Sequence, residues 1–117
     1  MSTLIYPALS ALRAFGEKLG VTANNVANVN TDGFKKTRAL LQDASPSGVT
    51  VSLSRIETPG VPLPPEQTTQ ASRESSNVEM EEEMVDLLTT KHAYTANLNT
   101  VKAEEEMIGT LLDIVNE

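Results

Sequence analysis

Apolar residues recur every three or four positions along the last third of the chain. Eleven positions follow this rhythm from Met80 to Val115, and nine of them are apolar; Lys91 and Glu105 are the exceptions. Steps of three and four average about 3.5 residues, close to one helical turn, so these side chains line one face of a helix. The pattern predicts a helix over residues 77–117 that reaches about 55–60 Å. A compact domain of this length is about 25–30 Å wide, so part of the helix should project.

A shorter stripe of the same rhythm occupies residues 1–30. Proline is tolerated in the first turn of a helix, so Pro7 places the start of the regular helix at residue 6 or 7. The helix should end near residues 28–30, because asparagine tolerates the geometry of a helix end and Thr31-Asp32-Gly33 is typical of a turn.

Two stripes of this kind each need a partner helix to cover them. Within one chain, the nearest partner for each stripe is the other. The predicted fold class is therefore mainly α: residues 1–30 and 77–117 form long helices that pack antiparallel as a coiled coil and make one core. Any face left over is available to a neighbouring subunit. The seam predicted for helix packing and assembly consists of Leu12, Phe15, Leu19, Val26, Met84, Leu87, Tyr94, Leu98, Val101, Ile108 and Leu112.

The first helix carries unusually little charge for a helix that faces water. Residues 1–29 contain only Arg13, Glu17 and Lys18 as charged side chains, and the face away from the stripe is Ser, Ala, Thr and Asn. A solvated helix face usually carries more charge, and small neutral residues allow a second surface to come close. We expect this helix to be covered on more than one side, as in an assembly.

Polar residues mark the start of the second helix. Ser76 and Glu79 have the spacing of a capping box, and Asn77 is an alternative cap. The acidic triplets at residues 81–83 and 104–106 cannot each converge on one metal ion, because consecutive helical residues point about 100° apart. We interpret both triplets as solvated faces, and the first also complements the positive end of the helix dipole.

The middle of the chain, residues 31–76, differs in composition from both ends. Four of the six prolines fall within residues 59–65, which should form an extended loop. Alternating apolar and polar residues predict a strand over residues 48–56, with a second strand at 40–43 or around 67–72. We expect a loop and a small β-hairpin or irregular lobe between the helices.

The net charge of −7 is unevenly divided along the sequence. Residues 77–117 carry ten acids and two bases, and this acidity argues against nucleic acid as a partner. The basic cluster of Lys35, Lys36 and Arg38 is open to three interpretations: phosphate binding, a solvated loop, or pairing with acids of a neighbouring helix, with Glu105 as one candidate.

Residues that carry chemistry are sparse. The single histidine, His92, has no carboxylate three or four positions away, so it lacks the positioned partner that a general base needs. Without cysteine there is neither a disulfide nor a thiolate metal site, and the six glycines form no phosphate-binding loop. No apolar run approaches the roughly 18 residues needed to span a bilayer. We predict no enzyme, no metal or cofactor, and no membrane-spanning segment.

One segment has a specificity that periodicity does not explain. Residues 21–35 resemble the N-terminal signature of the bacterial flagellar rod and hook family, whose core reads Ala-Asn-Asn-x-Ala-Asn-x-x-Thr-x-Gly-Phe-Lys. The runs 76–79, 83–87, 93–97 and 107–114 resemble the C-terminal signature of the same family. The matching residues of the N-terminal motif are Ala23, Asn24, Asn25, Ala27, Asn28, Thr31, Gly33, Phe34 and Lys35.

This motif also has a physical interpretation that stands beside the resemblance. Its asparagines can bond backbone groups where a helix frays and turns. Gly33 permits a positive φ, and Phe34 can then fill the gap between the helix end and the lobe. The motif is thus suited to a stable exit from the helix, to an assembly surface, or to both.

The resemblance implies a structural subunit of the flagellar basal-body rod, in which terminal helices pack toward the interior of a tube and the middle segment faces outward. The short middle segment is similar to that of the small FlgC-like members of the proximal rod. The implied partners are copies of itself, other rod subunits and the flagellar type III export apparatus, which exports such proteins without a cleaved signal peptide to the periplasm-spanning rod. The alternative is a soluble helical adaptor or export-associated factor of the flagellar system.

Overall fold

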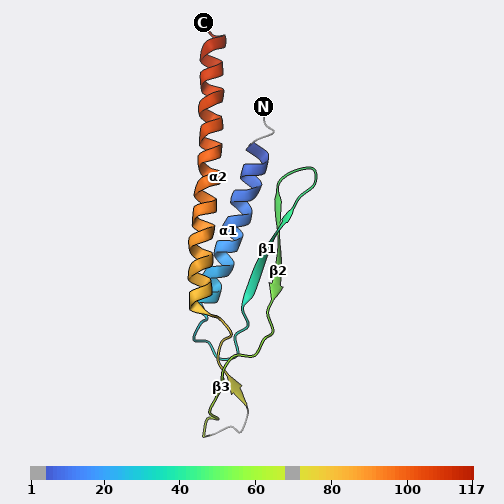
Figure 1. The fold of residues 1–117 in the computed structure, drawn as a ribbon, viewed down its shortest axis with the longest axis vertical. Coiled ribbons are helices and arrows are strands. Elements are labelled where there is room, and N and C mark those ends of the chain that lie inside the picture. Colours follow the sequence, from blue (N-terminus) through green and yellow to red (C-terminus); the bar gives the residue numbers. More distant parts are fainter. Residues whose placement is uncertain (1–4, 68–71) are drawn as a thin grey trace.

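Two helices of unequal length run antiparallel and side by side along the long axis of the molecule (Figure 1). α1 spans Ile5–Ala27 and α2 spans Met80–Val115. The computed structural model describes residues 5–67 and 72–117, and its extents are 81 × 24 × 18 Å. The prediction of a mainly helical fold with a long helix near each end is confirmed. Neither helix is both long and apolar enough to cross a membrane.

α1 contains Pro7 in its first turn, where the missing N–H costs no helical hydrogen bond. The helix ends at Ala27, slightly before the predicted end. Beyond it the chain tightens, because Asn28 N–H donates to the Asn25 carbonyl at 3.1 Å instead of one residue further back. The turn that follows contains Gly33 with φ of +71°, a conformation that glycine adopts at little cost.

α2 begins later than predicted, and the predicted capping box is wrong. The residue before the helix is Glu79, which makes no side-chain capping bond. Ser76 Oγ instead accepts a hydrogen bond from Val78 N–H at 3.1 Å, before the helix starts. The Asn77 side chain bonds the chain around residues 36 and 56–58, so it is not available as a cap.

The two helices differ in length, so α2 projects past α1. At about 1.5 Å per residue, 36 residues of α2 measure about 54 Å and 23 residues of α1 about 35 Å. The last turns of α2 stand free of α1 (Figure 1), and Val115 there is 79% exposed. The expectation that part of this helix projects is confirmed.

A two-stranded antiparallel hairpin packs along α1. β1 spans Thr37–Asp43 and β2 spans Val49–Arg55, with Thr37 opposite Arg55 and Asp43 opposite Val49. The strand predicted at 48–56 is confirmed as β2, and the one predicted at 40–43 is the second half of β1. The alternative second strand at 67–72 lies largely outside the described residues.

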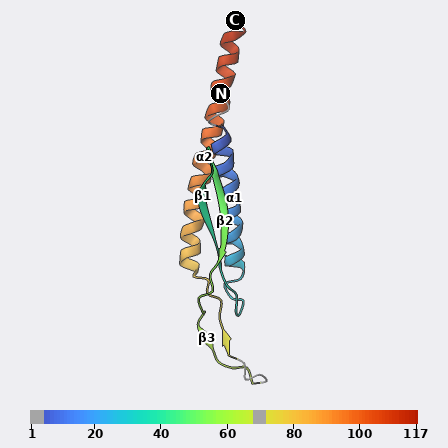
Figure 2. The same cartoon turned by 90° about the vertical axis from the view of Figure 1, so that its right-hand side faces the viewer.

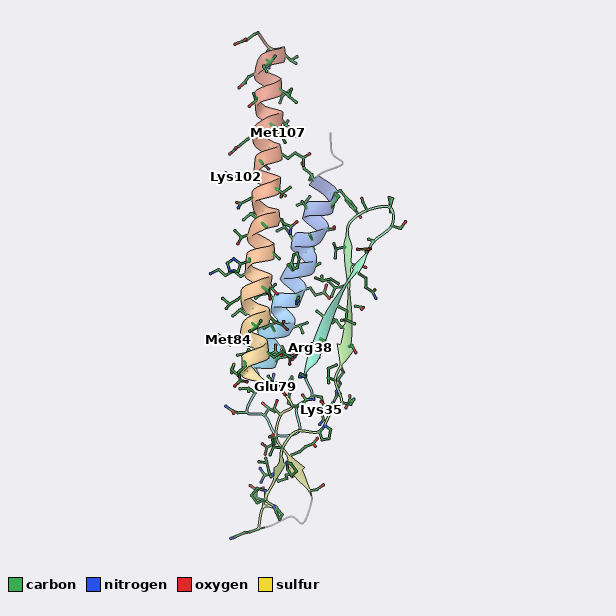
Figure 3. All side chains as sticks on the ribbon, viewed as in Figure 1. Lys35, Arg38, Glu79, Met84, Lys102 and Met107 are labelled. Carbon is green, nitrogen blue, oxygen red and sulfur yellow. The ribbon has the colours of Figure 1, made fainter. Side chains whose placement is uncertain are left out.

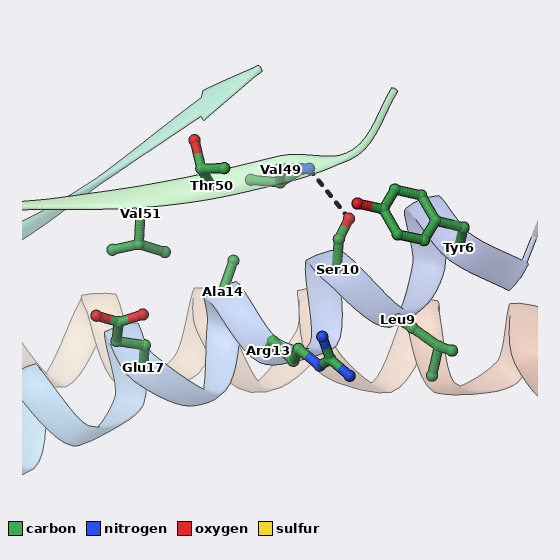
Figure 4. Close-up of a pocket in the computed structure, with 9 residues that line it drawn as sticks. All are labelled: Tyr6, Leu9, Ser10, Arg13, Ala14, Glu17, Val49, Thr50 and Val51. Carbon is green, nitrogen blue, oxygen red and sulfur yellow. Dashed lines mark hydrogen bonds between the residues drawn. The ribbon is translucent and has the colours of Figure 1, made fainter. Parts of the chain in front are cut away.

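Ser10 joins the hairpin to α1. Its hydroxyl donates to the Pro7 carbonyl at 2.8 Å. It also accepts from Val49 N–H at 3.0 Å, the bond drawn in Figure 4. A side chain at Gly48 would place its Cβ 2.7 Å from Ser10 Oγ, and the φ of this glycine is +103°. Close approach and backbone conformation therefore both require glycine at this end of the hairpin. A groove of about 440 Å³ remains between α1 and β2.

The proline-rich stretch forms a smaller ladder at the far end of the molecule from the free end of α2 (Figure 1). β3, Pro62–Leu63, pairs antiparallel with β4, Arg73–Glu74. This stretch was predicted as an extended loop, so β3 is a correction. The proline is tolerated because it occupies the first position of an edge strand, where no ladder hydrogen bond is needed from it.

α1 is covered on two sides, by α2 and by the hairpin, which lie on different faces of it (Figures 1 and 2). The expectation of cover on more than one side is confirmed, but the cover seen here comes from the same chain, and cover by an assembly stays a prediction. The small side chains that allow it are buried. Among the described residues, the buried apolar side chains are Ala8, Ala11, Ala14 and Val78.

Candidate assembly site

Every seventh residue on the side of α2 that faces α1 is polar. The exposed fraction is 0% for Glu83, 2% for Thr90 and 4% for Glu104. Asn97 is half-buried and borders the same small cavity as Ala8 and Ala11 of α1. A repeat of seven residues is close to two helical turns, so the four lie on one side of the helix. We call Glu83, Thr90, Asn97 and Glu104 the inner line.

A second line, also spaced by seven residues, points away from α1. Three of its five members, Met84, Leu98 and Leu112, were predicted to belong to the seam between the two helices, but all five members are exposed, with Met84 at 47% and Leu98 at 48%. Figure 3 shows Met84 near the start of α2. The predicted contact of this line with α1 of the same chain is therefore wrong. The role of the line in assembly with other subunits stays a prediction. We call Met84, Lys91, Leu98, Glu105 and Leu112 the outer line.

The contact face of α2 is rotated by about 50° from the predicted seam. In the other half of that seam, Leu87 and Tyr94 border a cavity together with Phe15 and Leu19 of α1. Leu87, Val101 and Ile108 are half-buried and Tyr94 is 40% exposed, and their role in a packing seam stays a prediction. In the contact with α1, the inner line occupies the position that was predicted for the outer line. A physical reason is the anchoring of Glu83 at the start of α2, because its carboxylate is held on the α1 side.

The predicted seam residues of α1 lie at the edge of this contact. Leu19 is 41% exposed, and the other three are half-buried. An open apolar cavity of about 210 Å³ lies between the helices, with Phe15 and Leu19 on one wall and Leu87 and Tyr94 on the other. The half-buried residues are Leu12, Phe15 and Val26.

Arg38 of β1 holds the start of α2 to the hairpin. Its Nη1 donates to Glu83 Oε1 at 2.6 Å and lies 3.7 Å from Asp86 Oδ2. Its Nη2 forms an ion pair with Glu82 Oε2 at 2.6 Å, without hydrogen-bond geometry. Figure 3 shows Arg38 between the lower ends of the helices and the hairpin. One guanidinium therefore contacts three acids of the first two turns of α2.

The Asn25 side chain completes this junction from α1. Asn25 is fully buried, and its Nδ2 donates to Glu83 Oε1 and Oε2, both at 3.3 Å. The same amide bonds β1 twice, since Nδ2 donates to the Thr37 carbonyl at 2.9 Å and Oδ1 accepts from Thr37 N–H at 3.1 Å. Three elements thus meet at one buried amide. We call Asn25, Arg38 and Glu83 the polar junction.

Electrostatics favour the charged forms of Arg38 and of Glu82 beside it. Burial lowers the pKa of Arg38, but the hydrogen bond to Glu83 and the charges of Glu83, Glu82 and Asp86 outweigh it, so the pKa is raised. The hydrogen bond from Lys36 and the charge of Arg38 lower the pKa of Glu82, against a smaller effect of burial.

The Glu82 carboxylate links stability to pH. Because its pKa is below the ordinary 4.5 in the folded chain, its stabilising contribution is present above pH 4.5 and is lost as the pH falls through the lower folded value. Glu82→Gln should therefore lose less stability than the wild type between neutral pH and about pH 3. Urea midpoints at both pH values measure this. Glu81→Gln, on the exposed side of the same turn, should behave like the wild type, and equal losses in all three proteins would contradict the assignment.

Asn77 makes a second polar connection, between the start of α2 and the loops below the hairpin. Its Oδ1 accepts from Lys36 N–H at 2.7 Å, and its Nδ2 donates to the Ile56 and Thr58 carbonyls at 2.8 and 2.9 Å. Nearby, Lys35 forms an ion pair with Glu74. Neither the role of Asn77 nor that of Glu83 was predicted, although the proximity of a basic cluster to acids was.

The remaining motif residues form the helix exit. Asn28 Nδ2 donates to the Asn24 carbonyl at 2.9 Å, and Thr31 Oγ1 donates to Asn28 Oδ1 at 3.1 Å. Phe34 is half-buried between the helix end and the loops, and its carbonyl accepts from Asn77 N–H at 3.2 Å. Ala23 and Ala27 are exposed. The expected backbone bonding is present at Asn25 and Asn28.

The structure corrects two further expectations about charge. Glu83 and Glu104 are buried, so the acidic triplets are not uniformly solvated. For the basic cluster, Lys36 and Arg38 pair with acids of a neighbouring helix, as in the third interpretation, but the acids belong to the start of α2 and not to position 105. No group of three or more His, Cys, Asp or Glu side chains within 5–67 and 72–117 is arranged to hold a metal ion.

Comparison with known proteins matches both ends of the chain. The family described as "Flagella basal body rod protein" matches residues 5–35, which cover α1 and its exit. The family described as "Flagellar basal body rod FlgEFG protein C-terminal" matches residues 69–114, which include α2 except its last residue. The flagellar basal-body rod protein FlgG of Bacillus subtilis (strain 168) is 49% identical over 39 residues, which are 33% of this chain and 15% of that relative.

Proposed function

Because the chain belongs to the flagellar basal body rod protein family, we propose that it is a structural subunit of the rod, the axial drive shaft of the bacterial flagellum. Its helices would pack against other subunits and transmit torque, with no catalytic step. The matching relative is much longer than the stretch it shares with this chain, so the role rests on the two terminal segments together with the surface they present.

The observation that carries the proposal is the outer line of α2. Three of its five residues are apolar and nearly half exposed or more, with Leu112 at 57%. The free end adds Ile114 at 63% and Val115 at 79%. Single exposed apolar residues are ordinary, but a row at heptad spacing along a helix is the form of a seam that lacks its partner. Neighbouring subunits would supply that partner.

The proposal extends to architecture and location. Residues 1–30 and 77–117 would form the coiled-coil core, and residues 31–76 the outer lobe. The partners would be copies of the chain and other rod subunits in the basal body, where the rod spans the periplasm. Delivery would use the flagellar type III export apparatus without a cleaved signal peptide. The FlgC-like, proximal-rod subtype is a further part of this proposal and rests on the short middle segment, because the matching names are those of the FlgEFG group and FlgG and do not specify that subtype.

Leu98→Asp should leave the chain folded and exclude it from the rod. Leu98 is 48% exposed, so the isolated chain has no buried charge to accommodate. In a closed seam the same carboxylate would be buried without a partner, which costs several kcal/mol, so incorporation should fall by about tenfold or more. Circular dichroism checks the fold, and immunoblots of purified basal bodies measure incorporation. Asn99→Asp, on the adjacent exposed position, should incorporate normally.

Deletion of the gene distinguishes a rod subunit from a soluble adaptor or export-associated factor. A rod subunit is required in the assembled shaft, so the deletion strain should lack complete basal bodies, and the tagged protein should co-purify with basal bodies after washing. A strain that builds complete basal bodies and swims normally would overturn the proposal. Recovery of the protein only in the soluble fraction would favour the adaptor.

A further inference from the structure

The basic residues of the chain fall into two groups. The five that lie between the helices all form ion pairs: Lys35, Lys36, Arg38, Arg55 and Arg73. The four on the helices form none with the described residues. Those four are Arg13, Lys18, Lys91 and Lys102.

The outer line contains one of these bases and one acid without an ion-pair partner among the described residues. Lys91 lies seven residues before Leu98, and Glu105 lies seven residues after it. At about 1.5 Å per residue, each charge is about 10 Å from Leu98 along the helix axis. Met84 and Leu112 lie at twice that distance on either side. The line therefore reads apolar, basic, apolar, acidic, apolar, with Leu98 at its centre.

This arrangement is complementary to itself when reversed. We infer that two copies of the chain pair through their outer lines, with the α2 helices antiparallel and a two-fold axis at Leu98. Lys91 of each copy then lies opposite Glu105 of the other, so two opposite-charge contacts form at once. Leu98 meets Leu98, and Met84 of each copy meets Leu112 of the other.

The charges of Lys91 and Glu105 favour an antiparallel pair over a parallel one. In a parallel pair of the same helices in register, Lys91 would face Lys91 and Glu105 would face Glu105. Like charges at facing positions are destabilising, and polar residues within a seam set orientation and register. The antiparallel arrangement replaces both repulsions by attractions, and the other three positions of the line still meet apolar residues.

The exposed surface beside the outer line is suited to this contact. Leu88, an apolar residue about 40° around the helix from Met84, is 56% exposed. The projecting end of α2 contributes as well, because its last turns extend past α1 (Figure 1) and Leu112 there is 57% exposed, so it is available to pack beside the start of the other copy's α2.

Such a pair closes on itself. A two-fold contact uses the same patch on both copies, so it cannot add a third copy through that patch. A filament built from one repeated orientation requires a different, head-to-tail contact. The inference thus goes beyond the proposed function: it describes a state of the isolated chain in which the outer line is covered by a second copy.

Cross-linking locates the axis directly, because the chain has no native cysteine. Leu98→Cys should form a disulfide-linked dimer under mild oxidation, since the two thiols meet at the axis. Asn99→Cys, one residue along and turned by about 100° around the helix, should form at least about tenfold less. Equal yields from the two variants, or a dimer formed only by Asn99→Cys, would overturn the placement of the axis.

Charge reversal tests the orientation in the full chain by sedimentation equilibrium. Lys91→Glu and Glu105→Lys should each weaken dimerisation by about tenfold or more, and the double variant should return to within about threefold of the wild type. Arg13→Glu is the matched control, because it reverses the charge of an exposed base on α1, away from the outer line, and it should change the dissociation constant less than about threefold. A wild type that remains strictly monomeric at about 100 μM would overturn the inference, because its dissociation constant would then be weaker than that of a typical specific pair. So would a double variant as weak as the single ones.

Discussion

Replacing Arg38 with methionine should lower the free energy of unfolding by about 3–5 kcal/mol, because it leaves a buried carboxylate without its charge partner. Glu83 is fully buried, and Arg38 Nη1 is its only cationic contact at 2.6 Å among the described residues. The Asn25 amide at 3.3 Å provides dipoles but no compensating charge. Urea denaturation followed by circular dichroism at neutral pH measures the loss.

Two further variants show whether the burial of the charge is responsible. Arg55→Met removes an ion pair whose side chains are 64% and 67% exposed, so it should cost less than about 1 kcal/mol. The double variant Arg38→Met with Glu83→Met replaces both charges by side chains of similar length and should recover most of the stability lost in Arg38→Met. If Arg38→Met costs no more than Arg55→Met, the junction does not hold α2 in place.

Replacing Ala11 with aspartate should separate α1 from its two covering layers. Ala11 is 7% exposed and borders a cavity shared by α1, α2 and the turn of the hairpin. A carboxylate there would be buried without a base, and its extra volume would force the layers apart, with an expected loss of about 3 kcal/mol or more. The melting temperature and the amide exchange of α1 measure the effect.

Ala23→Asp is the matched control for this experiment, because it makes the same substitution on an exposed face of α1. It should cost less than about 1 kcal/mol, mostly through helix propensity. A loss as large as that of Ala11→Asp would mean that the aspartate acts through the helix itself and not through the contact between layers.

The elements themselves were well predicted from the sequence, because hydrophobic period and turn residues are local signals. Apolar steps of three and four placed both helices, and the alternation at 49–55 placed β2. β1 was found only in part, since Thr37 and Arg38 at its start carry no apolar alternation. They are strand residues because Asn25 and the opposite strand bond their backbone.

The rotation of α2 was not predictable from periodicity. The stripe that reads as the better seam, with Met84, Leu98 and Leu112, faces outward, and a line of polar residues faces α1. Contacts distant in sequence decide this: Glu83 is 58 residues from Asn25 and 45 from Arg38. A pattern of apolar residues reports which side chains need cover, but not whether the cover comes from the same chain or from another one.

The inner line also has a thermal consequence. The heat capacity change of unfolding grows with the apolar surface that becomes wet, by about 0.45 cal/mol/K per Å², and polar surface offsets it. Here the described residues that are buried are mostly alanine, threonine, asparagine and glutamate. Unfolding this chain should therefore carry a small heat capacity change for its length. Its stability curve would then have little curvature, so cooling should weaken the fold less than it weakens a protein with a large apolar core.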